Sequence, residues 1–243
     1  MAIDPASTQV VYAGTSGGGV FKSTNGGSSW TEINTGLTSL WVFSLAIDPA
    51  NTQVVYAGTG GGVFKSTNGG SSWTAINTGL TSLIVLSLAI DPASTQVVYA
   101  GTWGEVFKST NGGSSWTAIN TGLTDLIVRS LAIDPTSTQV VYAGTEGGGV
   151  FKSTNGGSSW TAIDTGLPDL MVRSLAIDPT STQVVYAGTS RGVFKSTNGG
   201  SSWTAINTGL TDLNVRSLAI DPASTQVVYA GTAGTGGGVF KWR

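Results

Sequence analysis

The octet STNGGSSW occupies residues 23–30 and recurs unchanged at residues 66–73, 109–116, 153–160 and 196–203. A second marker, the tetrapeptide AIDP, places its aspartate at positions 4, 48, 91, 134, 178 and 221, a spacing of 43 or 44 residues. A period of this size is typical of supersecondary units that bury their apolar faces only against neighbouring copies. The sequence therefore predicts a repeat protein in which the octet marks one turn of each complete repeat.

One repeat, residues 128–167, contains four short runs rich in strand-forming residues: VRSLAI, QVVYAGT, GVFKS and WTAI, here called runs A to D. Run B is apolar at consecutive positions from Val140 to Ala143, so both of its faces are expected to be buried. Run D alternates and is expected to be half exposed. This gradient predicts four-stranded antiparallel blades that pack face to face.

The count of runs decides the number of blades. There are six runs each of A, B and C but five of D, because the sequence opens within run A and ends in run C. The end repeats are as apolar as the middle ones, which favours a closed ring over an open solenoid with polar caps. The predicted fold class is therefore an all-β, six-bladed β-propeller whose last blade has three strands.

One propeller domain is predicted over residues 1–243, with blades at about 1–37, 40–80, 83–123, 126–167, 170–210 and 213–243. The last run C, near Phe240, is expected to present a bare edge. Bare strand edges pair readily with other chains, so a monomer or an edge-mediated homodimer is predicted.

Composition argues against several classes of function. The formal net charge is −2 with scattered lysines, so neither nucleic acid nor an anionic membrane is expected as a partner. Cysteine and histidine are absent, which removes thiolate nucleophiles, imidazole bases and the usual transition-metal ligands. No catalytic residue, metal site or cofactor is predicted. The chain shows no signal peptide and no apolar run of membrane-spanning length, so it is expected to be soluble, in a compartment that the sequence leaves open.

The octet has the pattern S-x-N-x-G-x-x-W and resembles the Asp-box, or BNR repeat, of the sialidase-like propellers. That superfamily also includes sortilin-type receptors, xyloglucanases and photosystem assembly factors. The resemblance covers all five complete repeats and implies the propeller fold, but asparagine replaces the usual aspartate. The positions it marks as structural are Ser23, Asn25, Gly27, Trp30, Asn68, Trp73, Asn111, Trp116, Asn155, Trp160, Asn198 and Trp203.

The chemistry of the octet favours a structural role. An asparagine side chain can accept backbone N–H groups a few residues on, Gly26 and Gly27 permit positive φ, and Trp30 can fold over apolar surface. In propellers the A-to-B and C-to-D turns share one face, and the B-to-C and D-to-A loops emerge at the other. The octet is therefore interpreted as a staple on the face opposite to the expected binding surface.

The repeats differ mainly in their B-to-C loops and D-to-A connections. Loops on a rigid scaffold are where recognition usually resides, so these two groups form the candidate binding face. The candidate binding residues on this variable face are Trp103, Glu105, Glu146, Arg191, Trp41, Arg129, Arg173 and Arg216.

Three repeats carry an aspartate four residues before an arginine, and the other repeats carry neither. The pairs are Asp125 with Arg129, Asp169 with Arg173, and Asp212 with Arg216. The matching favours Asp–Arg ion pairs, which contribute under about 1 kcal/mol each when partly exposed. The alternative is an arginine arc that binds a ligand carboxylate through bidentate hydrogen bonds. The three arginines share one repeat position, unlike a sialidase triad, and every tyrosine occupies the same VVYAGT slot, where packing is favoured over catalysis.

Glycosidases use two carboxyl groups, and Glu105 and Glu146 on neighbouring B-to-C loops are the pair that could serve. Neither has an evident neighbour to raise its pKa. Trp103 and Trp41 offer aromatic platforms for a sugar ring or a protein. We therefore predict a non-enzymatic Asp-box propeller, either a rigid scaffold or a module that binds a protein or a glycan. A lectin-like protein and a degenerate glycoside hydrolase are the alternatives. The near identity of the repeats favours recent amplification of one blade or an engineered origin.

Overall fold

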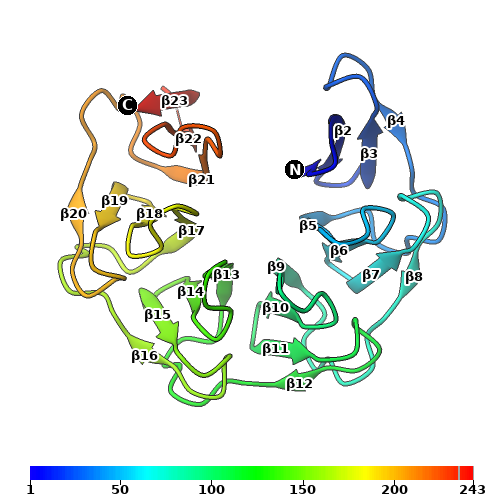
Figure 1. The fold of residues 1–243 in the computed structure, drawn as a ribbon, viewed down its shortest axis with the longest axis horizontal. Coiled ribbons are helices and arrows are strands. Elements are labelled where there is room, and N and C mark those ends of the chain that lie inside the picture. The colour runs from blue at the N-terminus through cyan, green and yellow to red at the C-terminus, as the bar shows by residue number, and fades with distance from the viewer. Residues whose placement is uncertain (235, 243) are drawn as a thin grey trace. The chain divides into compact units, whose positions relative to one another are not determined.

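The computed structural model describes residues 1–234 and 236–242. Within these residues, 23 strands form six antiparallel sheets (Figure 1), five with four strands and the last with three. The fold is therefore an all-β, six-bladed β-propeller with a three-stranded last blade, as predicted. The chain divides into two compact units, Met1–Ile119 and Asn120–Arg243, and each contains three blades.

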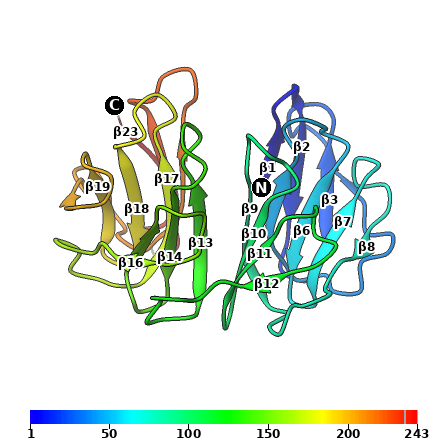
Figure 2. The same ribbon diagram turned by 60° about the horizontal axis from the view of Figure 1, so that its bottom comes forward.

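The blades of the first unit, drawn from blue to green in Figure 2, are numbered 1 to 3. In each the strands pair in chain order. Blade 1 comprises β1 (Ala2–Asp4), β2 (Ser7–Gly14), β3 (Val20–Ser23) and β4 (Thr31–Glu32). Blade 2 comprises β5 (Val42–Ile47), β6 (Val55–Thr59), β7 (Gly62–Ser66) and β8 (Thr74–Ala75). Blade 3 comprises β9 (Val85–Ile90), β10 (Val98–Thr102), β11 (Val106–Ser109) and β12 (Thr117–Ala118).

The blades of the second unit are numbered 4 to 6 and pair in the same order. Blade 4 comprises β13 (Val128–Ile133), β14 (Val141–Thr145), β15 (Val150–Ser153) and β16 (Thr161–Ala162). Blade 5 comprises β17 (Val172–Ile177), β18 (Val185–Thr189), β19 (Gly192–Ser196) and β20 (Thr204–Ala205). Blade 6 comprises β21 (Val215–Ile220), β22 (Val228–Thr232) and β23 (Val239–Trp242). Among the described residues, no helix has the length and apolarity needed to cross a membrane.

The hydrophobic core lies between successive blades of a unit. Every residue of β6 is buried, as expected for a strand covered on both faces. In the core cluster between blades 1 and 2, Tyr12 and Val20 of the first blade pack with Val42, Val55 and Trp73 of the second. Burial of each such aliphatic or aromatic side chain contributes about 1.5–3 kcal/mol, so a blade is stabilised chiefly by its neighbours.

Run D forms a shorter strand than its sequence suggests. The predicted strand from Trp73 to Ile76 is reduced to Thr74–Ala75. The backbone N–H of Trp73 donates to the carbonyl oxygen of Thr35 in the preceding blade at 2.9 Å, and so does not extend the ladder with β7. Its indole Nε1 also donates to Ile33 O in that blade, at 2.7 Å. The tryptophan therefore ties one blade to the next.

The AIDP motif forms the predicted turn. Asp48 is 5% exposed, and its Oδ1 accepts the backbone N–H groups of Ala50 at 2.9 Å and Asn51 at 3.3 Å. At the equivalent Asp134, burial alone would raise the pKa of the carboxyl. Hydrogen bonds from Thr136, Thr182 and Ser137 together outweigh that effect, so the pKa lies below its ordinary value.

We predict that stability falls at high pH because of the buried tyrosines. Burial raises the pKa of Tyr56 and of Tyr142 to about 12, with a smaller contribution from the nearby aspartate in each case. A folded-state pKa above the unfolded value contributes stability that is present below about pH 10 and is lost as the pH rises toward 12. Urea unfolding at pH 9 to 12 should show this loss, on the order of 2 kcal/mol per tyrosine, and Tyr142→Phe should reduce its slope. A free energy of unfolding that does not change above pH 10 would contradict this assignment.

Candidate functional site

The octet forms the same hydrogen-bonded turn in each complete blade. In blade 2 the hydroxyl of Ser66 accepts the backbone N–H of Gly70 at 2.8 Å, and Asn68 Oδ1 accepts the N–H of Ser72 at 2.9 Å. Gly69 and Gly70 both have positive φ, which glycine adopts without strain. The octet's polar side chains therefore hydrogen-bond within their own turn.

The octet turn of one blade docks on the blade before it. The carbonyl oxygen of Gly69 accepts hydrogen bonds from the hydroxyl of Tyr12 at 3.1 Å and from Lys22 Nζ at 2.9 Å. Ile33 lies so close to Gly70 that an added Cβ would collide with it. We call such a set of tyrosine, lysine and isoleucine a socket. Blade 1 thus provides a socket for the octet turn of blade 2.

In each complete blade the variable B-to-C loop precedes the strand of run C and the octet turn follows it, so the two lie at opposite ends of that strand. The B-to-C loop of blade 3 meets the connection that enters the blade, where the N–H of Trp103 donates to Ile84 O at 3.0 Å. In blade 4, the N–H of Glu146 donates to Ile127 O at 3.0 Å. The expectation that B-to-C loops and D-to-A connections lie together is confirmed.

In the first unit this variable face is apolar. Trp41 is 57% exposed and Trp103 is 49% exposed, and Phe43 and Leu83 are exposed as well. The backbone of Trp41 forms an isolated antiparallel bridge with Ser16 in the B-to-C loop of blade 1. The side chain of Glu105 accepts a hydrogen bond from the hydroxyl of Thr81.

In the second unit the variable face is rich in arginine. Among residues 1–234 and 236–242, the recorded ion pair joins Arg129 Nε to Glu146 Oε2, and both side chains are about one quarter exposed. The hydrogen bond from the N–H of Glu146 to Ile127 O brings its side chain beside the start of β13, where Arg129 lies. This pairing was not predicted from the sequence.

Each of the three aspartates accepts hydrogen bonds from backbone N–H groups, and the Asp–Arg ion pairs stay a prediction. Asp125 accepts the backbone N–H of Ile127 at 3.0 Å, and Asp169 accepts those of Met171 at 3.1 Å and Ser190 at 3.0 Å. Asp212 likewise accepts the N–H of Asn214 at 2.9 Å. The carboxylates begin tight turns and bind the N–H groups that these turns expose.

The three arginines nevertheless form one group, which we call the arginine cluster: Arg129, Arg173 and Arg216. Burial lowers the pKa of Arg129, and the positive charges of Arg173 and then Arg216 lower it further. Burial and the charge of Arg216 likewise lower the pKa of Arg173, against an opposite effect of Asp169. A charge shifts a neighbouring group's pKa only at short range, so Arg173 and Arg216 lie near Arg129, and Arg216 lies near Arg173.

Two residues that the sequence comparison missed hold Arg173 in place. Its guanidinium donates to Asn214 Oδ1, and Nη2 lies 2.8 Å from Met171 Sδ. Met171 and Asn214 occupy the same repeat position as Trp41, where the repeats differ. That variation was the sequence feature that could have identified them as candidates. Arg191 is exposed on the loop between β18 and β19, where its backbone N–H donates to Thr189 Oγ1 at 3.0 Å.

The predicted carboxyl pair is divided between the two units: Glu105 lies in the first unit and Glu146 in the second. No group of three or more acidic side chains that could hold a metal ion occurs among the described residues.

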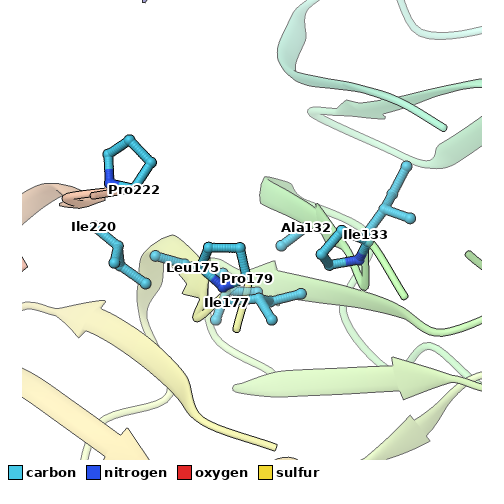
Figure 3. Close-up of a pocket in the computed structure, with 9 residues that line it drawn as sticks. Ala132, Ile133, Leu175, Ile177, Pro179, Ile220 and Pro222 are labelled. Carbon is cyan, nitrogen blue, oxygen red and sulfur yellow. The ribbon is translucent and has the colours of Figure 1, made fainter. Parts of the chain in front are cut away.

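An apolar pocket of about 370 Å³ lies in the second unit (Figure 3). Its lining residues come from the ends of β13, β17 and β21 and the turns that follow: Ala132, Ile133, Pro135, Leu175, Ala176, Ile177, Pro179, Ile220 and Pro222. These are shared scaffold positions of the LAIDP motif, and none offers a polar side chain to orient a ligand. The pocket therefore follows from the repeat and gives no evidence of a specific site.

The arrangement of four-stranded blades and octet turns has a counterpart among known families. The family model described as "Sortilin, neurotensin receptor 3" (Sortilin-Vps10) matches residues 104–233, which is 130 of the 243 residues. The chain belongs to the Sortilin-Vps10 family. The matched segment extends from the B-to-C loop of blade 3 to that of blade 6, and so contains the arginine cluster.

Solved structures similar to this Sortilin-Vps10 chain include two GH74 enzymes. An ancestral GH74 enzyme is 28% identical with a TM-score of 0.84, over 99% of this chain and 35% of that enzyme. The GH74 enzyme of Niastella koreensis is 26% identical with a TM-score of 0.78, over 98% and 44%. YCF48 bound to D1 peptide shares the fold, at 14% identity and a TM-score of 0.64, over 92% and 71%. The chain spans less than half the length of either GH74 enzyme, and no curated protein sequence matches it.

We predict that the octet asparagine stabilises its turn as a hydrogen-bond acceptor. Asn68→Ala removes the bond to Ser72 N–H and that to the Ser66 hydroxyl, so the free energy of unfolding should fall by about 1 kcal/mol. Asn68→Asp keeps the acceptor oxygen, and the hydroxyl of Ser72 can rotate to donate, so its loss should be smaller. Urea unfolding measures both. Equal losses in the two variants would show that the side-chain oxygen is not the stabilising group.

Proposed function

We propose that this chain is a non-enzymatic interaction module that binds a carboxylate-bearing partner, protein or glycan, through its variable face. The observation that supports this most directly is the arginine cluster. Arg173 and Arg216 lie close enough to Arg129 to lower its pKa, and Arg216 lowers that of Arg173, in the part of each blade where the repeats differ. Holding like charges together is unfavourable, and a bound anion would offset that cost.

The cluster retains hydrogen-bond donors for a ligand. A guanidinium has five N–H donors in a planar fork that matches a carboxylate. Arg216 is exposed, so its guanidinium donors are accessible to a ligand. The aspartates of the same connections accept hydrogen bonds from backbone N–H groups. A ligand carboxylate would therefore meet oriented donors.

A glycan is the second candidate for the partner. The exposed indoles of Trp41 and Trp103 are suited to stacking on sugar rings. The two similar GH74 enzymes are both more than 25% identical to this chain. Hydrolysis is less well supported. One carboxyl of a glycosidase pair donates a proton, whereas Glu146 is the anionic partner of Arg129 and Glu105 accepts a hydrogen bond from Thr81.

Paired charged and neutral probes test this proposal. Labelled hexaglutamate and tetragalacturonate supply carboxylates on a peptide and on a glycan, and hexaglutamine and a neutral tetrasaccharide are their controls. We expect at least one carboxylate probe to bind more tightly than its neutral control in fluorescence anisotropy. The double variant Arg173→Ala/Arg216→Ala should weaken that binding at least tenfold, since hydrogen bonds to charged groups contribute about 1.5–3 kcal/mol each.

The matched control is Arg191→Ala, which removes an exposed arginine outside the cluster and should leave affinity within about twofold. The proposal is overturned if neither carboxylate probe binds more tightly than its neutral control, or if the two sets of variants weaken binding equally.

A further inference from the structure

Large apolar side chains are exposed on the variable face of the first unit. They belong to the D-to-A connections and first strands of blades 2 and 3, and to the B-to-C loop of blade 3. Each is between 38% and 57% exposed, and we call them the aromatic patch: Leu40, Trp41, Phe43, Leu83, Ile84 and Trp103. Soluble proteins seldom expose a large contiguous apolar surface unless it binds a partner.

Each of the two blades contributes one indole to this patch. In blade 2 the N–H of Gly60 donates to Trp41 O at 2.9 Å, and in blade 3 the N–H of Trp103 donates to Ile84 O at 3.0 Å. An added Cβ at Gly60 would lie 3.6 Å from Trp41 Cβ and 3.9 Å from Phe43 Cε2. The glycine therefore leaves both aromatic side chains of blade 2 uncovered, and in blade 3 the tryptophan takes the position of the glycine.

Contacts between blades 2 and 3 bring the two halves of the patch together. Val85, which follows Ile84, packs on β6, where an added Cβ at Gly58 would lie 2.8 Å from Val85 Cγ1. The inner strands β5 and β9 are neighbours (Figure 1), and the N–H of Leu88 donates to Ser44 Oγ at 3.0 Å. The aromatic patch therefore extends over two adjacent blades of one unit.

A carboxylate borders the patch in blade 3. Glu105 is partly exposed and lies two residues after Trp103. Its side chain accepts a hydrogen bond from the hydroxyl of Thr81, which lies two residues before Leu83. The negative charge is thus held between the two segments of blade 3 that contribute to the patch.

A second carboxylate borders the patch at blade 1. Asn34 Nδ2 donates to Glu32 Oε1 at 2.8 Å and to Gly18 O at 3.0 Å. The N–H of the next residue, Gly19, donates to Leu40 O at 2.9 Å. This series of contacts links the exposed Glu32 to the other side of the patch.

The basic side chains of the first unit lie at the opposite end of their strands. Residues 1–119 contain three lysines and no arginine, and each lysine belongs to run C next to an octet. Lys22 and Lys65 donate to octet glycine carbonyls of the next blade, and Lys108 lies over the Tyr99 ring, 5.2 Å from its centroid. The variable face of this unit therefore has two carboxylates and no basic side chain to balance them.

An aromatic surface bordered by carboxylates is suited to a cation with an apolar stem. The head group of lysine or arginine is attracted to the face of an indole, and its methylene stem can be buried on apolar surface. The carboxylates attract such a group and repel an anion. A neutral sugar can stack on the indoles but gains nothing from the negative charge. Because the patch extends over two blades, it matches several side chains of one segment.

We propose that the aromatic patch and its two glutamates bind a peptide segment of another polypeptide that is rich in lysine or arginine and in large apolar residues. The cationic side chains lie across the indoles of Trp41 and Trp103, with Glu105 as their counter-charge. This site lies in the first unit and selects positive charge, whereas the arginine cluster lies in the second unit and selects negative charge. The inference therefore goes beyond the proposed function and does not rest on it.

The test uses the N-acetylated, C-terminally amidated peptide KLKKLK, measured by isothermal titration calorimetry. Its control is the same peptide with every lysine side chain acetylated, which keeps the stem and removes the charge. We expect saturable binding of the lysine peptide, and binding at least tenfold weaker for the acetylated peptide. Cellotetraose should not displace the lysine peptide. Arg173→Ala/Arg216→Ala should not weaken its binding, which separates this site from the arginine cluster.

Matched variants locate the site. Trp103→Ala should weaken binding of the lysine peptide about tenfold, through loss of the indole. Glu105→Gln should weaken it about fivefold and leave the acetylated peptide unaffected, because glutamine keeps an acceptor for Thr81. Asp164→Asn makes the same change in net charge within the second unit and introduces the asparagine found at the equivalent position of the other complete blades, so affinity should stay within about twofold.

A further variant converts the patch toward the sequence of the second unit. Phe43 occupies the repeat position of Arg129, so Phe43→Arg introduces a residue that the same scaffold already carries in blade 4. It should weaken binding of the lysine peptide at least tenfold, because like charges repel. Thermal unfolding verifies that each variant is folded at the assay temperature.

The proposal is overturned if the lysine peptide shows no saturable binding at millimolar concentration, or if the acetylated peptide binds equally tightly. Displacement of the lysine peptide by cellotetraose would identify a saccharide site instead. Equal effects of Glu105→Gln and Asp164→Asn would show that only the net charge of the chain matters, and would likewise overturn the proposal.

Discussion

The stacking of blades depends on one hydrogen-bonded contact, the carbonyl oxygen of the first octet glycine with a lysine and a tyrosine of the preceding blade. Gly69 is buried, and an unpaired carbonyl acceptor there would cost about 1–3 kcal/mol. Tyr12 and Lys22 face each other across neighbouring strands in the β2–β3 register, so their donor groups converge on that oxygen. The lysine also lies over the tyrosine ring, 5.2 Å from its centroid, which keeps its charge close to an electron-rich surface.

This contact explains why the octet varies so little. The second glycine cannot carry a Cβ because the socket isoleucine lies beneath it, and the tryptophan must reach two carbonyl groups of the preceding blade. Serine and asparagine hold the turn that presents the carbonyl. Each residue of the octet that is constrained in this way serves the joint between blades. The B-to-C loops and D-to-A connections take no part in this contact, so their sequences are free to differ.

Much of the fold could be predicted from the sequence because the period, the alternation of apolar residues and the turn residues all agree. The strand that follows each octet was predicted too long, since the pattern WTAI does not reveal that the tryptophan N–H binds another blade. Individual contacts at the variable face were less predictable. The ion pair of Arg129 with Glu146 depends on the path of two loops, and the spacing of aspartate and arginine suggested a different pairing. Asn214 was missed because its role is to hold another side chain.

The contact between octet and socket is tested most directly by comparing two equivalent lysines in the same chain. Lys65 donates to Gly112 O, whereas Lys195, its counterpart in blade 5, has no recorded hydrogen bond within the described residues. In urea unfolding, Lys65→Met should lower the free energy of unfolding by about 1–3 kcal/mol, and Lys195→Met should change it by less than about 0.5 kcal/mol. Equal losses at the two positions would contradict the view that the lysine acts through the octet carbonyl.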